Sequence, residues 1–465
     1  MPLQIAVNSS SNGPQYAVDS SNGLLVPIST VVVSSEDYAV FGNGGGATVQ
    51  IFGFVGGLYG VSLGGTGTTS DVLSVGIGGT IASQSIGVSL RSSSSMLVNF
   101  GQINSALSNA VTFASATGGL AGRLYNYGTI QGGNTGILAV SGAGDVRIYN
   151  YGTISCPEYK AIYTDLGNDR LVNRGRIEGD VDLYSGNDTL LNRGLISADV
   201  LLGNGTDLLD NRGGTIDGNI SLGSGTDTFI PGSGIETANG GTEIDTLDFT
   251  KSSGVRVALD GSIDGTGWAK DDVYTSFEKV IGSSTGNDTL IGDGGDNFLT
   301  GLGGNDILNG QSGADTLYGG RGVDTVNGGD GNDFLYGEDG NDILVGGAGF
   351  DQFTGGTGAD KFVFTLADVA GSQKTPGNYD VINDFKHAEA DKIDLSAIDA
   401  NVNVAKDQAF TFIGTSAFHN VAGELKLELV VAGYFVQGDT NGDGVADFTI
   451  AVAPDGVLVA SDFVL

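Results

Sequence analysis

The sequence predicts an all-β protein in which a parallel β-solenoid, a stack of short parallel strands wound into coils, continues into a β-roll and ends in a β-rich cap. Three observations lead to this fold class. The 465-residue chain has 81 Gly but only 7 Pro, which fits neither collagen nor an ordinary disordered tract. Nine nonapeptides follow one another without a gap over residues 283–363. A looser repeat precedes them, as is typical of elongated repeat proteins.

Residues 1–95 are predicted to form a Ser/Gly/Val-rich amino-terminal β region. Charged residues are few here, and no Lys or Arg precedes Arg91. Short β-branched runs such as residues 29–34 are bounded by glycine, as expected of strands. We interpret this region as a cap or a continuation of the solenoid.

Residues 96–240 are predicted to be a β-solenoid built on the pattern Asn-x-Gly-x-Ile. The pattern begins at Asn99, Asn126, Asn150, Asn173, Asn192 and, with one extra residue, Asn211. The intervals are 27, 24, 23, 19 and 19 residues. We expect coils that shorten toward the nonapeptides.

Acidic turns alternate with these motifs. Asp169, Asp188, Asp207 and Asp227 each end a Gly-x-Asp triplet, and Asp245 follows in a related sequence. Two interpretations remain open: calcium ligands along one edge, or solvated turn aspartates.

Arg174, Arg193 and Arg212 recur once per predicted coil. Such a ladder could grip an acidic polysaccharide. Alternatively, each Arg pairs with a neighbouring acidic turn, as exposed charges in acidic proteins commonly do.

The nonapeptides keep one phase throughout. Position 8 is always Leu, Val or Phe, and glycine at position 4 permits a turn with positive φ. The residues at positions 4 and 6 are the predicted metal-site pairs: Gly286 and Asp288, Gly295 and Asn297, Gly304 and Asp306, Gly313 and Asp315, Gly322 and Asp324, Gly331 and Asp333, Gly340 and Asp342, Gly349 and Asp351, Gly358 and Asp360.

Two nonapeptides make one predicted coil, so Asp306, Asp324 and Asp342 stack at about 4.8 Å. Neighbouring carboxylates at that spacing repel by about 3 to 4 kcal/mol at an effective dielectric constant near 20. Ca²⁺ takes six to eight oxygens and fits turns rich in carboxylates and carbonyls. If one ion lies between repeats n and n+2, the array holds about seven calcium ions with a total charge of about +14. The array has 13 acidic and 2 basic residues, so the charges of ions and protein nearly cancel. We therefore expect calcium binding and folding to be coupled.

The nonapeptide resembles the RTX repeat GGxGxDxUx, a calcium-binding β-roll signature. The chain also resembles the carboxyl-terminal domain of serralysin-type proteases. This resemblance begins at about residue 240 and is carried by residues 277–282 and by segments such as 380–385 and 391–396. It implies a calcium β-roll over residues 241–363 and a serralysin-like cap with a secretion signal over residues 364–465. It also implies Ca²⁺ as cofactor and the type I secretion machinery as partner.

A second calcium loop is predicted inside the cap. Asp439, Asn441, Asp443 and Asp447 stand at positions 1, 3, 5 and 9 of an EF-hand-like segment. The Glu expected at position 12 is missing, since Ala451 follows Ile450 where the loop would close. A calcium-stabilised hairpin and a plain Asp/Gly turn are both open.

Several features predict secretion to the cell exterior or cell surface. The first residues lack a basic stretch followed by a long apolar one, so no Sec signal peptide is predicted, and no apolar run has transmembrane length. Asp462–Leu465, an acidic residue before apolar ones, looks like an uncleaved type I signal. The single cysteine, Cys156, excludes an internal disulfide framework.

Composition and motifs also limit the function. A net charge of −34 opposes nucleic acid and anionic membranes as partners. His387 and His419 are the only histidines, so the zinc motif HExxH is absent, as is the Tyr-Gly-x-Asp-Pro-His signature expected of alginate epimerases. We predict a noncatalytic extracellular structural, surface-layer or adhesive protein that binds itself or cell-surface glycans. The alternative is a polysaccharide-active protein, lyase-like or epimerase-like, or a glycan-binding one.

Overall fold

The fold is described from a computed structural model. It covers residues 3–5, 9–11, 16–18, 23–27, 30–42, 46–64, 70–114, 122–140, 144–369 and 379–465. The chain forms two compact units: the first holds residues 1–246 and 272–276, and the second holds residues 247–271 and 277–465. Nearly all regular structure is β, which confirms the predicted fold class. No described helix is long and apolar enough to cross a bilayer.

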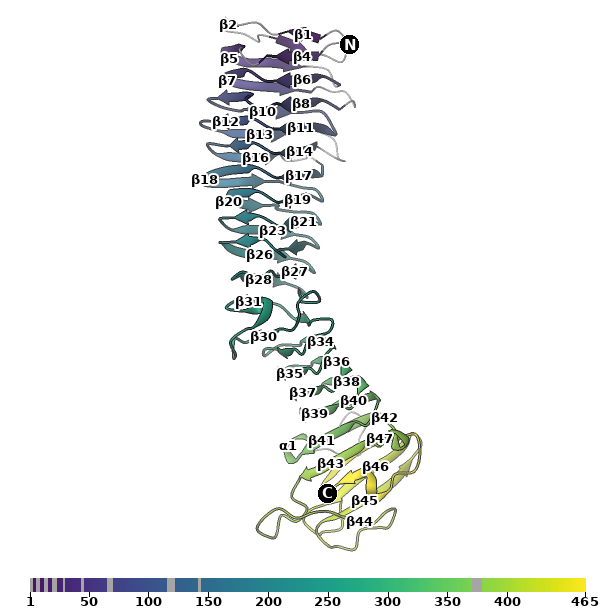
Figure 1. The fold of residues 1–465 in the computed structure, drawn as a ribbon. Coiled ribbons are helices and arrows are strands. Elements are labelled where there is room, and N and C mark those ends of the chain that lie inside the picture. The colour runs from purple at the N-terminus through teal and green to yellow at the C-terminus, as the bar shows by residue number, and fades with distance from the viewer. Residues whose placement is uncertain are drawn as a thin grey trace. The chain divides into compact units, whose positions relative to one another are not determined.

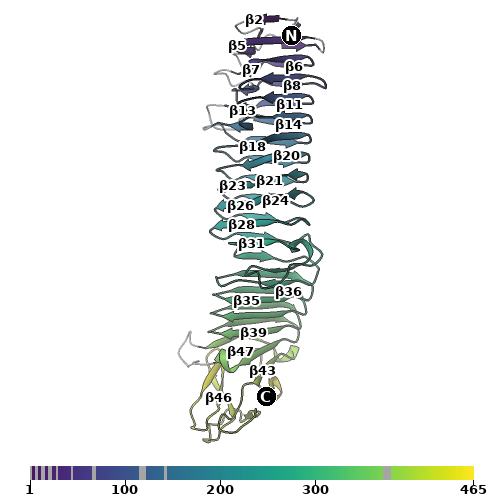
Figure 2. The same cartoon turned by 90° about the vertical axis from the view of Figure 1, so that its left-hand side faces the viewer.

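The first unit is a parallel β-solenoid whose coils lie one above another (Figures 1 and 2). One sheet contains β1 (Leu3–Ile5), β4 (Gly23–Val26), β6 (Thr48–Ile51), β8 (Val72–Val75), β11 (Ser95–Asn99), β14 (Gly122–Asn126), β17 (Val146–Asn150), β19 (Arg170–Asn173), β21 (Thr189–Asn192), β24 (Leu208–Asp210) and β27 (Thr228–Ile230). Each strand pairs in parallel with its equivalent in the next coil; Leu124, for example, lies opposite Leu97 and Ile148.

The other sheet of this unit is also parallel. It contains β2 (Ser9–Ser11), β3 (Tyr16–Val18), β5 (Val31–Gly42), β7 (Phe54–Leu63), β9 (Thr80–Ser83), β10 (Val88–Leu90), β12 (Gln102–Ser105), β13 (Asn109–Phe113), β15 (Thr129–Gln131), β16 (Thr135–Ala139), β18 (Thr153–Tyr163), β20 (Arg176–Asp182), β22 (Leu195–Ile196), β23 (Val200–Asn204), β25 (Thr215–Ile216), β26 (Asn219–Ser224), β28 (Thr237–Thr242) and β31 (Val273–Thr275). The described strands of residues 1–95 are therefore solenoid strands.

The Asn-x-Gly-x-Ile pattern is explained by three contacts that recur in each coil. The isoleucines, such as Ile130 opposite Ile103 and Ile154, lie in register and are fully buried. A Cβ on Gly152 would lie 2.1 Å from the carbonyl oxygen of Gly128, so the coils approach too closely there for a side chain. The asparagines form a continuous ladder of buried amides.

In this ladder each amide donates to the next coil. Asn126 Nδ2 donates to Asn150 Oδ1 at 2.8 Å, and Asn150 Nδ2 donates to Asn173 Oδ1 at 2.9 Å. The chain of bonds runs from Asn99 to Asn211, which donates to Glu236 Oε1 at 2.8 Å. Every ladder asparagine is 0% exposed, so the bonds satisfy groups that water does not reach.

Replacing Asn150 by alanine is expected to lower the stability of the first unit by about 3 kcal/mol. The substitution leaves Asn126 and Asn173 each without one buried partner, and an unsatisfied buried group costs about 1 to 3 kcal/mol. Thermal unfolding in saturating calcium measures the change. Asn134→Ala is the control, because Asn134 is exposed. Equal midpoints for the two variants would contradict a stabilising role for the ladder.

The second unit contains the roll and the cap. Its roll strands are β29 (Thr246–Asp248, whose first residue belongs to the first unit), β30 (Arg256–Ala258), β32 (Lys279–Ile281), β33 (Thr289–Ile291), β34 (Phe298–Gly303), β35 (Ile307–Ser312), β36 (Thr316–Gly322), β37 (Thr325–Asp330), β38 (Phe334–Gly340), β39 (Ile343–Ala348), β40 (Gln352–Thr357) and β41 (Lys361–Thr365), with the short 3-10 helix η1 (Gly267–Ala269). Alternate strands pair in parallel, with Leu299 opposite Leu317 and Leu317 opposite Leu335. The 18-residue shift confirms two nonapeptides per coil.

The side chain at position 8 of every nonapeptide, from Leu290 to Phe362, is 0% exposed. The first turn differs from the predicted phase by one residue. Gly282, rather than Ser283, occupies the first glycine position, because a Cβ there would lie 2.4 Å from Asp288 Oδ2. The turn before Asp288 is therefore one residue longer than the turns that follow.

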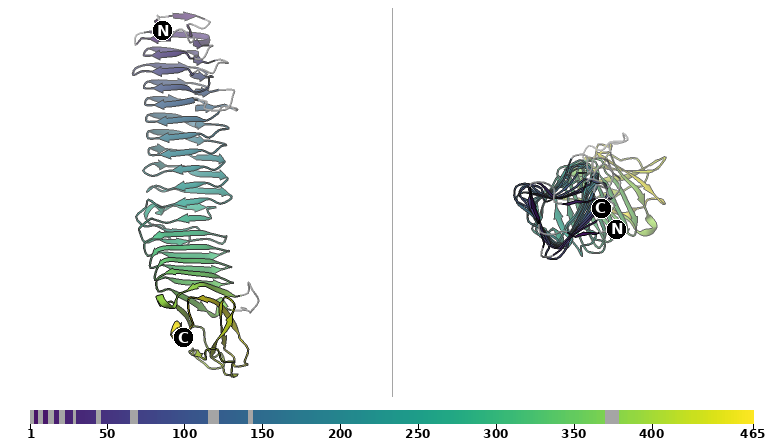
Figure 3. Two further views of the ribbon diagram at one scale, coloured as in Figure 1. Left: turned by 90° about the vertical axis from the view of Figure 1, so that its right-hand side faces the viewer. Right: turned by 90° about the horizontal axis from the view of Figure 1, so that it is seen from above.

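The cap closes the roll with strands of both directions (Figure 3). It contains α1 (Leu366–Val369), β42 (Asp380–Phe385), η2 (His387–Glu389), β43 (Lys392–Ala397), β44 (Thr411–Phe412), β45 (Glu424–Val430), β46 (Gly433–Asp439), β47 (Phe448–Pro454), η3 (Ala460–Asp462) and β48 (Phe463–Val464). β42 and β43 continue the two sheets of the roll in parallel, whereas β45, β46 and β47 are antiparallel.

Candidate metal centres

The position-6 side chains of the nonapeptides form two hydrogen-bonded ladders, one along each edge of the roll. In the first ladder, the N–H of Asp306 donates to Asp324 Oδ1 at 2.7 Å, and the N–H of Asp324 donates to Asp342 Oδ1 at 2.8 Å. In the second ladder, the N–H of Asp315 donates to Asp333 Oδ1 at 2.8 Å. One oxygen of each carboxylate is thus fixed by the coil before it.

The other carboxylate oxygen has no hydrogen-bond partner. This holds for the Oδ2 atoms of Asp306, Asp315, Asp324, Asp333, Asp342, Asp351, Asp360 and Asp380. Each of these residues is at most 1% exposed. A buried ionised oxygen without a partner is strongly unfavourable, so these atoms require a cation or a proton.

The space beside each free oxygen is bordered by backbone carbonyls, and glycine keeps it open. A Cβ on Gly310 would lie 2.1 Å from Asp315 Oδ2 and 2.6 Å from the carbonyl oxygen of Gly328. The same relation recurs at Gly328, next to Asp333 Oδ2 at 2.2 Å. A carboxylate oxygen and a carbonyl oxygen from successive coils therefore converge where a side chain would otherwise stand.

Burial raises the pKa of these carboxyl groups, and the neighbouring carboxylates of each ladder raise it further. The pKa of Asp306, Asp315 and Asp342 rises to about 7, and that of Asp351 to about 8. An acid whose pKa is raised by folding destabilises the folded state as pH increases through that range. At neutral pH the metal-free roll therefore keeps many of these carboxyl groups protonated, and a cation that replaces the protons allows them to ionise without this cost.

The donor set fits calcium. Among the described residues, no three His, Cys, Asp or Glu side chains form a group that could hold a metal by themselves. A site here takes its remaining ligands from backbone carbonyls, and Ca²⁺ accepts such mixed oxygen ligands in flexible geometry. The paired carboxylates and carbonyls described above would hold it.

Comparison with known proteins agrees with this chemistry. The profile of the RTX calcium-binding nonapeptide repeat (4 copies) matches residues 283–317, 300–335, 309–344, 318–353 and 336–364. These segments are RTX calcium-binding repeats. The solution structure of the AlgE6R3 subunit from the Azotobacter vinelandii mannuronan C5-epimerase is 28% identical, with 36% of this chain and 82% of that chain covered and a TM-score of 0.25. No curated protein matches the chain.

The RTX array has specialised ends. Asp288 is not left with a free oxygen, because Oδ1 accepts the N–H of Val255 at 2.7 Å and Oδ2 accepts the N–H of Ser283 at 2.6 Å. At the other end, Asp380 and Asp391 of the cap continue the two ladders, accepting the N–H groups of Asp351 and Asp360 at 2.9 Å. Our sequence reasoning missed both cap residues because they follow at 29 and 31 residues instead of 18. The sequence feature that could have identified them is an Asp with an apolar residue two positions later, as in Asp380-Val-Ile382.

The remaining predicted array residues lie where the pattern places them. Asn297 takes the position of an aspartate, and its Oδ1 accepts the N–H of Asp293 at 2.8 Å. Position-4 glycines form the turns. Positive φ is found at Gly304, Gly313, Gly322, Gly331, Gly340, Gly349 and Gly358, as predicted, but not at Gly286 and Gly295 in the first two repeats.

The acids of the solenoid form a ladder of the same kind. Asp169 N–H donates to Asp188 Oδ1, Asp188 N–H to Asp207 Oδ1 and Asp207 N–H to Asp227 Oδ1, each at 2.7 Å, and Asp227 N–H donates to Asp245 Oδ1 at 2.9 Å. The Oδ2 atoms of Asp188, Asp207 and Asp227 are buried and without a partner. Burial raises the pKa of Asp188 to about 8.

This solenoid ladder differs from the array at one position. Five residues before each free carboxylate, where the array has glycine, the solenoid has Leu183, Leu202 or Leu222, all fully or almost fully buried. Gly240 restores the array pattern before Asp245, and a Cβ there would lie 2.7 Å from Asp245 Oδ2. Calcium binding by Asp169, Asp188, Asp207, Asp227 and Asp245 stays a prediction.

The structure brings the four residues of the predicted cap loop together between β46 and β47. Both oxygens of Asp439 accept loop N–H groups, from Gly442 at 2.6 Å and Gly444 at 2.9 Å. Asp447 accepts from Thr440 and Asn441. The N–H groups of Asp443 and Val445 donate to Asn441 and Asp443, respectively. The loop carboxylates already have donors, so calcium binding here also stays a prediction.

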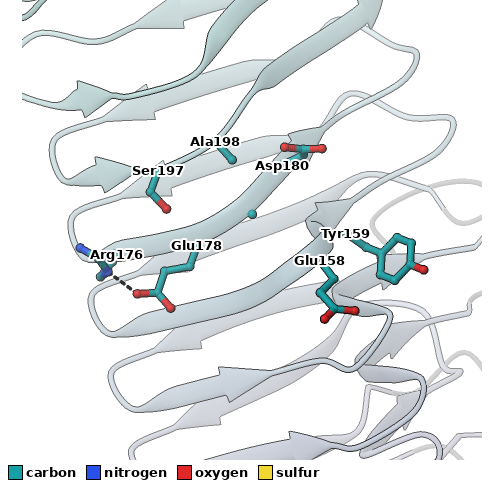
Figure 4. A pocket seen from close by; sticks show the side chains of 8 residues that line it. Glu158, Tyr159, Arg176, Glu178, Asp180, Ser197 and Ala198 are labelled. Carbon is teal, nitrogen blue, oxygen red and sulfur yellow. Dashed lines mark hydrogen bonds and ion pairs between the residues drawn. The ribbon is translucent and has the colours of Figure 1, made fainter.

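A shallow hollow lies on the solenoid, outside both ladders (Figure 4). Its lining includes Glu158, Tyr159, Arg176, Glu178 and Asp180. An irregularity in the pairing of β18 with β20 lies at this place. Arg176 Nε is bound to Glu178 at 2.5 Å, so its charge is already engaged.

A match to the nucleophile pattern G-x-S-x-G, overlooked in our sequence reasoning, occurs at Gly60-Val-Ser62-Leu-Gly64. A nucleophile of this type needs a sharp turn from strand to helix. Ser62 lies instead within strand β7 and is 0% exposed. The match is therefore part of the solenoid core.

Proposed function

We propose that this chain is a secreted calcium-binding protein that folds on Ca²⁺ after type I export and serves a structural, surface-layer or adhesive role outside the cell. The observation that carries the proposal is the set of buried carboxylate oxygens without partners along both edges of the RTX array. They make the folded roll dependent on a cation.

Charge repulsion explains why the array would fold outside the cell and not inside it. Without calcium, stacked carboxylates repel by about 3 to 4 kcal/mol per neighbouring pair, and the roll buries only one apolar side chain per nonapeptide position 8. In a cell compartment with little free calcium the array stays unfolded and can be threaded through an exporter. Calcium outside the cell then supplies the folding free energy.

The arrangement of the last strand supports export before folding. Asp462 is 1% exposed and binds His387 Nδ1 at 2.7 Å. Phe463 pairs with Ile393 in the adjacent strand β43 and is 7% exposed. A signal formed by Asp462–Leu465 is therefore accessible to the secretion machinery in the unfolded chain, whereas its first two residues are buried once the cap has folded.

We further propose that calcium binding extends beyond the array to Asp380 and Asp391 in the cap, and to the solenoid ladder that ends at Asp245. The free Oδ2 atoms of Asp188, Asp207 and Asp227 support the extension. The leucines that replace glycine beside them favour weaker sites than those of the array.

The experiment that tests this function measures self-assembly of the protein and degradation of a polysaccharide side by side. Purified protein is titrated with calcium while light scattering and electron microscopy follow assembly, and a polyuronate-degradation assay runs in parallel. Calcium-dependent folding with ordered sheets or filaments, and without unsaturated uronate products, supports the structural role. Formation of such products favours the polysaccharide-active alternative and overturns the noncatalytic proposal.

A further inference from the structure

A column of arginines lies on the outward face of the solenoid. Arg123, Arg147 and Arg170 stand directly opposite one another on the neighbouring strands β14, β17 and β19 (Figure 1). Strands in a sheet lie about 4.8 Å apart, and like charges directly opposite each other are destabilising. The column therefore has a binding preference for anions.

Within the described part of the chain, none of these three guanidinium groups forms a hydrogen bond or an ion pair. This separates them from two of the three arginines that the sequence pattern singled out. The third, Arg174, likewise has no side-chain partner among the described residues, so its predicted ion pair is not observed. Arg193 and Arg212 both bind Asp210, at 2.6 and 2.7 Å, and they lower its pKa to about 2 despite its burial. Those two arginines are therefore ion-paired, but their partner is Asp210 at the end of strand β24 and not one of the Gly-x-Asp turns.

Tyrosines stand beside the arginine column. Tyr125 and Tyr149 are two residues further along β14 and β17, and their rings stack with centroids 4.9 Å apart and planes 7° apart. Next to them, Phe100, Tyr127 and Tyr151 form a second stack at 4.8 and 4.9 Å. These three side chains are 41 to 46% exposed.

Stacking determines what such a surface offers to a ligand. Tyr125 and Tyr149 cover one face of each other, and in the second stack both faces of Tyr127 are covered. Single-stranded nucleic acids bind by stacking bases on open ring faces, which the neighbouring rings leave only at the ends of the two stacks. Hydroxyls and guanidinium groups repeated once per coil instead match a chain of linked sugars that carries carboxylate or sulfate groups.

The local charge permits an anionic ligand although the whole chain is acidic. No Asp or Glu occurs in residues 72–144, which contain Arg123. Near the other two arginines, Asp145 accepts the N–H of Asn168, and Asp169 is buried and accepts the N–H of Val146. Charges further away than about 8 Å are largely screened at physiological ionic strength. An anion at the arginine column therefore meets three arginines, against Asp145 and the buried Asp169.

We propose that the arginine–tyrosine face, formed by Arg123, Arg147, Arg170, Tyr125 and Tyr149, binds an acidic polysaccharide laid along the solenoid axis. This deepens the adhesive role proposed above by naming the partner class and the surface. A second copy of the chain is a poorer partner, because much of its acid lies buried in ladders that calcium would neutralise.

The test uses the calcium-loaded full chain and oligogalacturonides too short to gel, with affinity measured by titration calorimetry. Replacing all three arginines by glutamine is expected to weaken binding about tenfold, since it removes three exposed ion pairs with the ligand. The matched control is Lys251→Gln with Lys270→Gln and Lys279→Gln, which removes the same charge from the second unit and should leave affinity within about twofold. Chondroitin sulfate should bind as well, whereas neutral dextran should not.

Other results would overturn the proposal. These are equal losses in the two triple variants, equal binding of dextran, tighter binding of single-stranded DNA, or binding only by association of the protein with itself in sedimentation. Absence of any binding by the unmodified protein also overturns it, while calcium-dependent folding, measured separately by circular dichroism, would still stand.

Discussion

Replacing Gly322 by alanine is expected to prevent the RTX array from folding in calcium. Gly322 has φ +139°, and a Cβ there would lie 1.6 Å from the carbonyl oxygen of Gly304 in the coil before. Neither the backbone conformation nor the distance admits a side chain, so the coils must separate at a metal site. We expect a loss of more than about 4 kcal/mol, a magnitude seen only when a specific structural requirement is broken.

Circular dichroism during a calcium titration measures this effect. The Gly322→Ala protein should lose most of its calcium-induced β signal. Gly294→Ala is the control within the same array, because nothing lies within 4 Å of a Cβ at Gly294. If both variants folded at the same calcium concentration, close stacking of the turns would not be a condition for the fold.

Replacing Asp324 and Asp342 together by asparagine is expected to change stability in opposite directions with and without calcium. Asparagine keeps the oxygen that accepts the N–H of the preceding coil but removes the free carboxylate oxygen and its charge. Without calcium, the variant loses a repulsion of about 3 to 4 kcal/mol and should be more compact than the unmodified chain. With calcium, it loses ligands and should need a higher calcium concentration to fold.

The control for this pair is Asp330→Asn with Asp339→Asn, which removes the same charge from exposed positions outside the ladders. Small-angle scattering in chelator and the calcium midpoint from circular dichroism are the two measurements. A shift of the same sign under both conditions would mean that the ladder carboxylates act through general charge rather than as ligands.

Regular spacing made the roll predictable. An 18-residue coil follows from nine in-phase nonapeptides, and the inward position 8 follows from the alternation of a strand. The two cap residues that extend the ladders, Asp380 and Asp391, could not be predicted from a fixed period. They follow the last aspartate of their ladder after 29 and 31 residues instead of 18, because extra residues are inserted before them. The extra residue before Asp288, and its bond to Ser283, likewise depend on how the first turn packs.

The solenoid gave less information because its coils change length. The Asn-x-Gly-x-Ile pattern predicted the coils, but the amide ladder is visible only when Asn126, Asn150 and Asn173 are superimposed in space. The column of Arg123, Arg147 and Arg170 was missed for the same reason. Its members each precede the repeated Asn by three residues, a sequence signal that could have found them, and the strand register shows that they are direct neighbours.

The most direct test of calcium-coupled folding is amide hydrogen exchange of the full chain with and without calcium at neutral pH. Exchange reports local opening along the chain. We predict that amides of residues 292–363 exchange without protection in excess chelator and become protected when calcium is restored, while strands β11, β14 and β17 of the solenoid are protected in both conditions. Protection of residues 292–363 in chelator would contradict the account, since it would show that the stacked carboxylates tolerate one another without a metal.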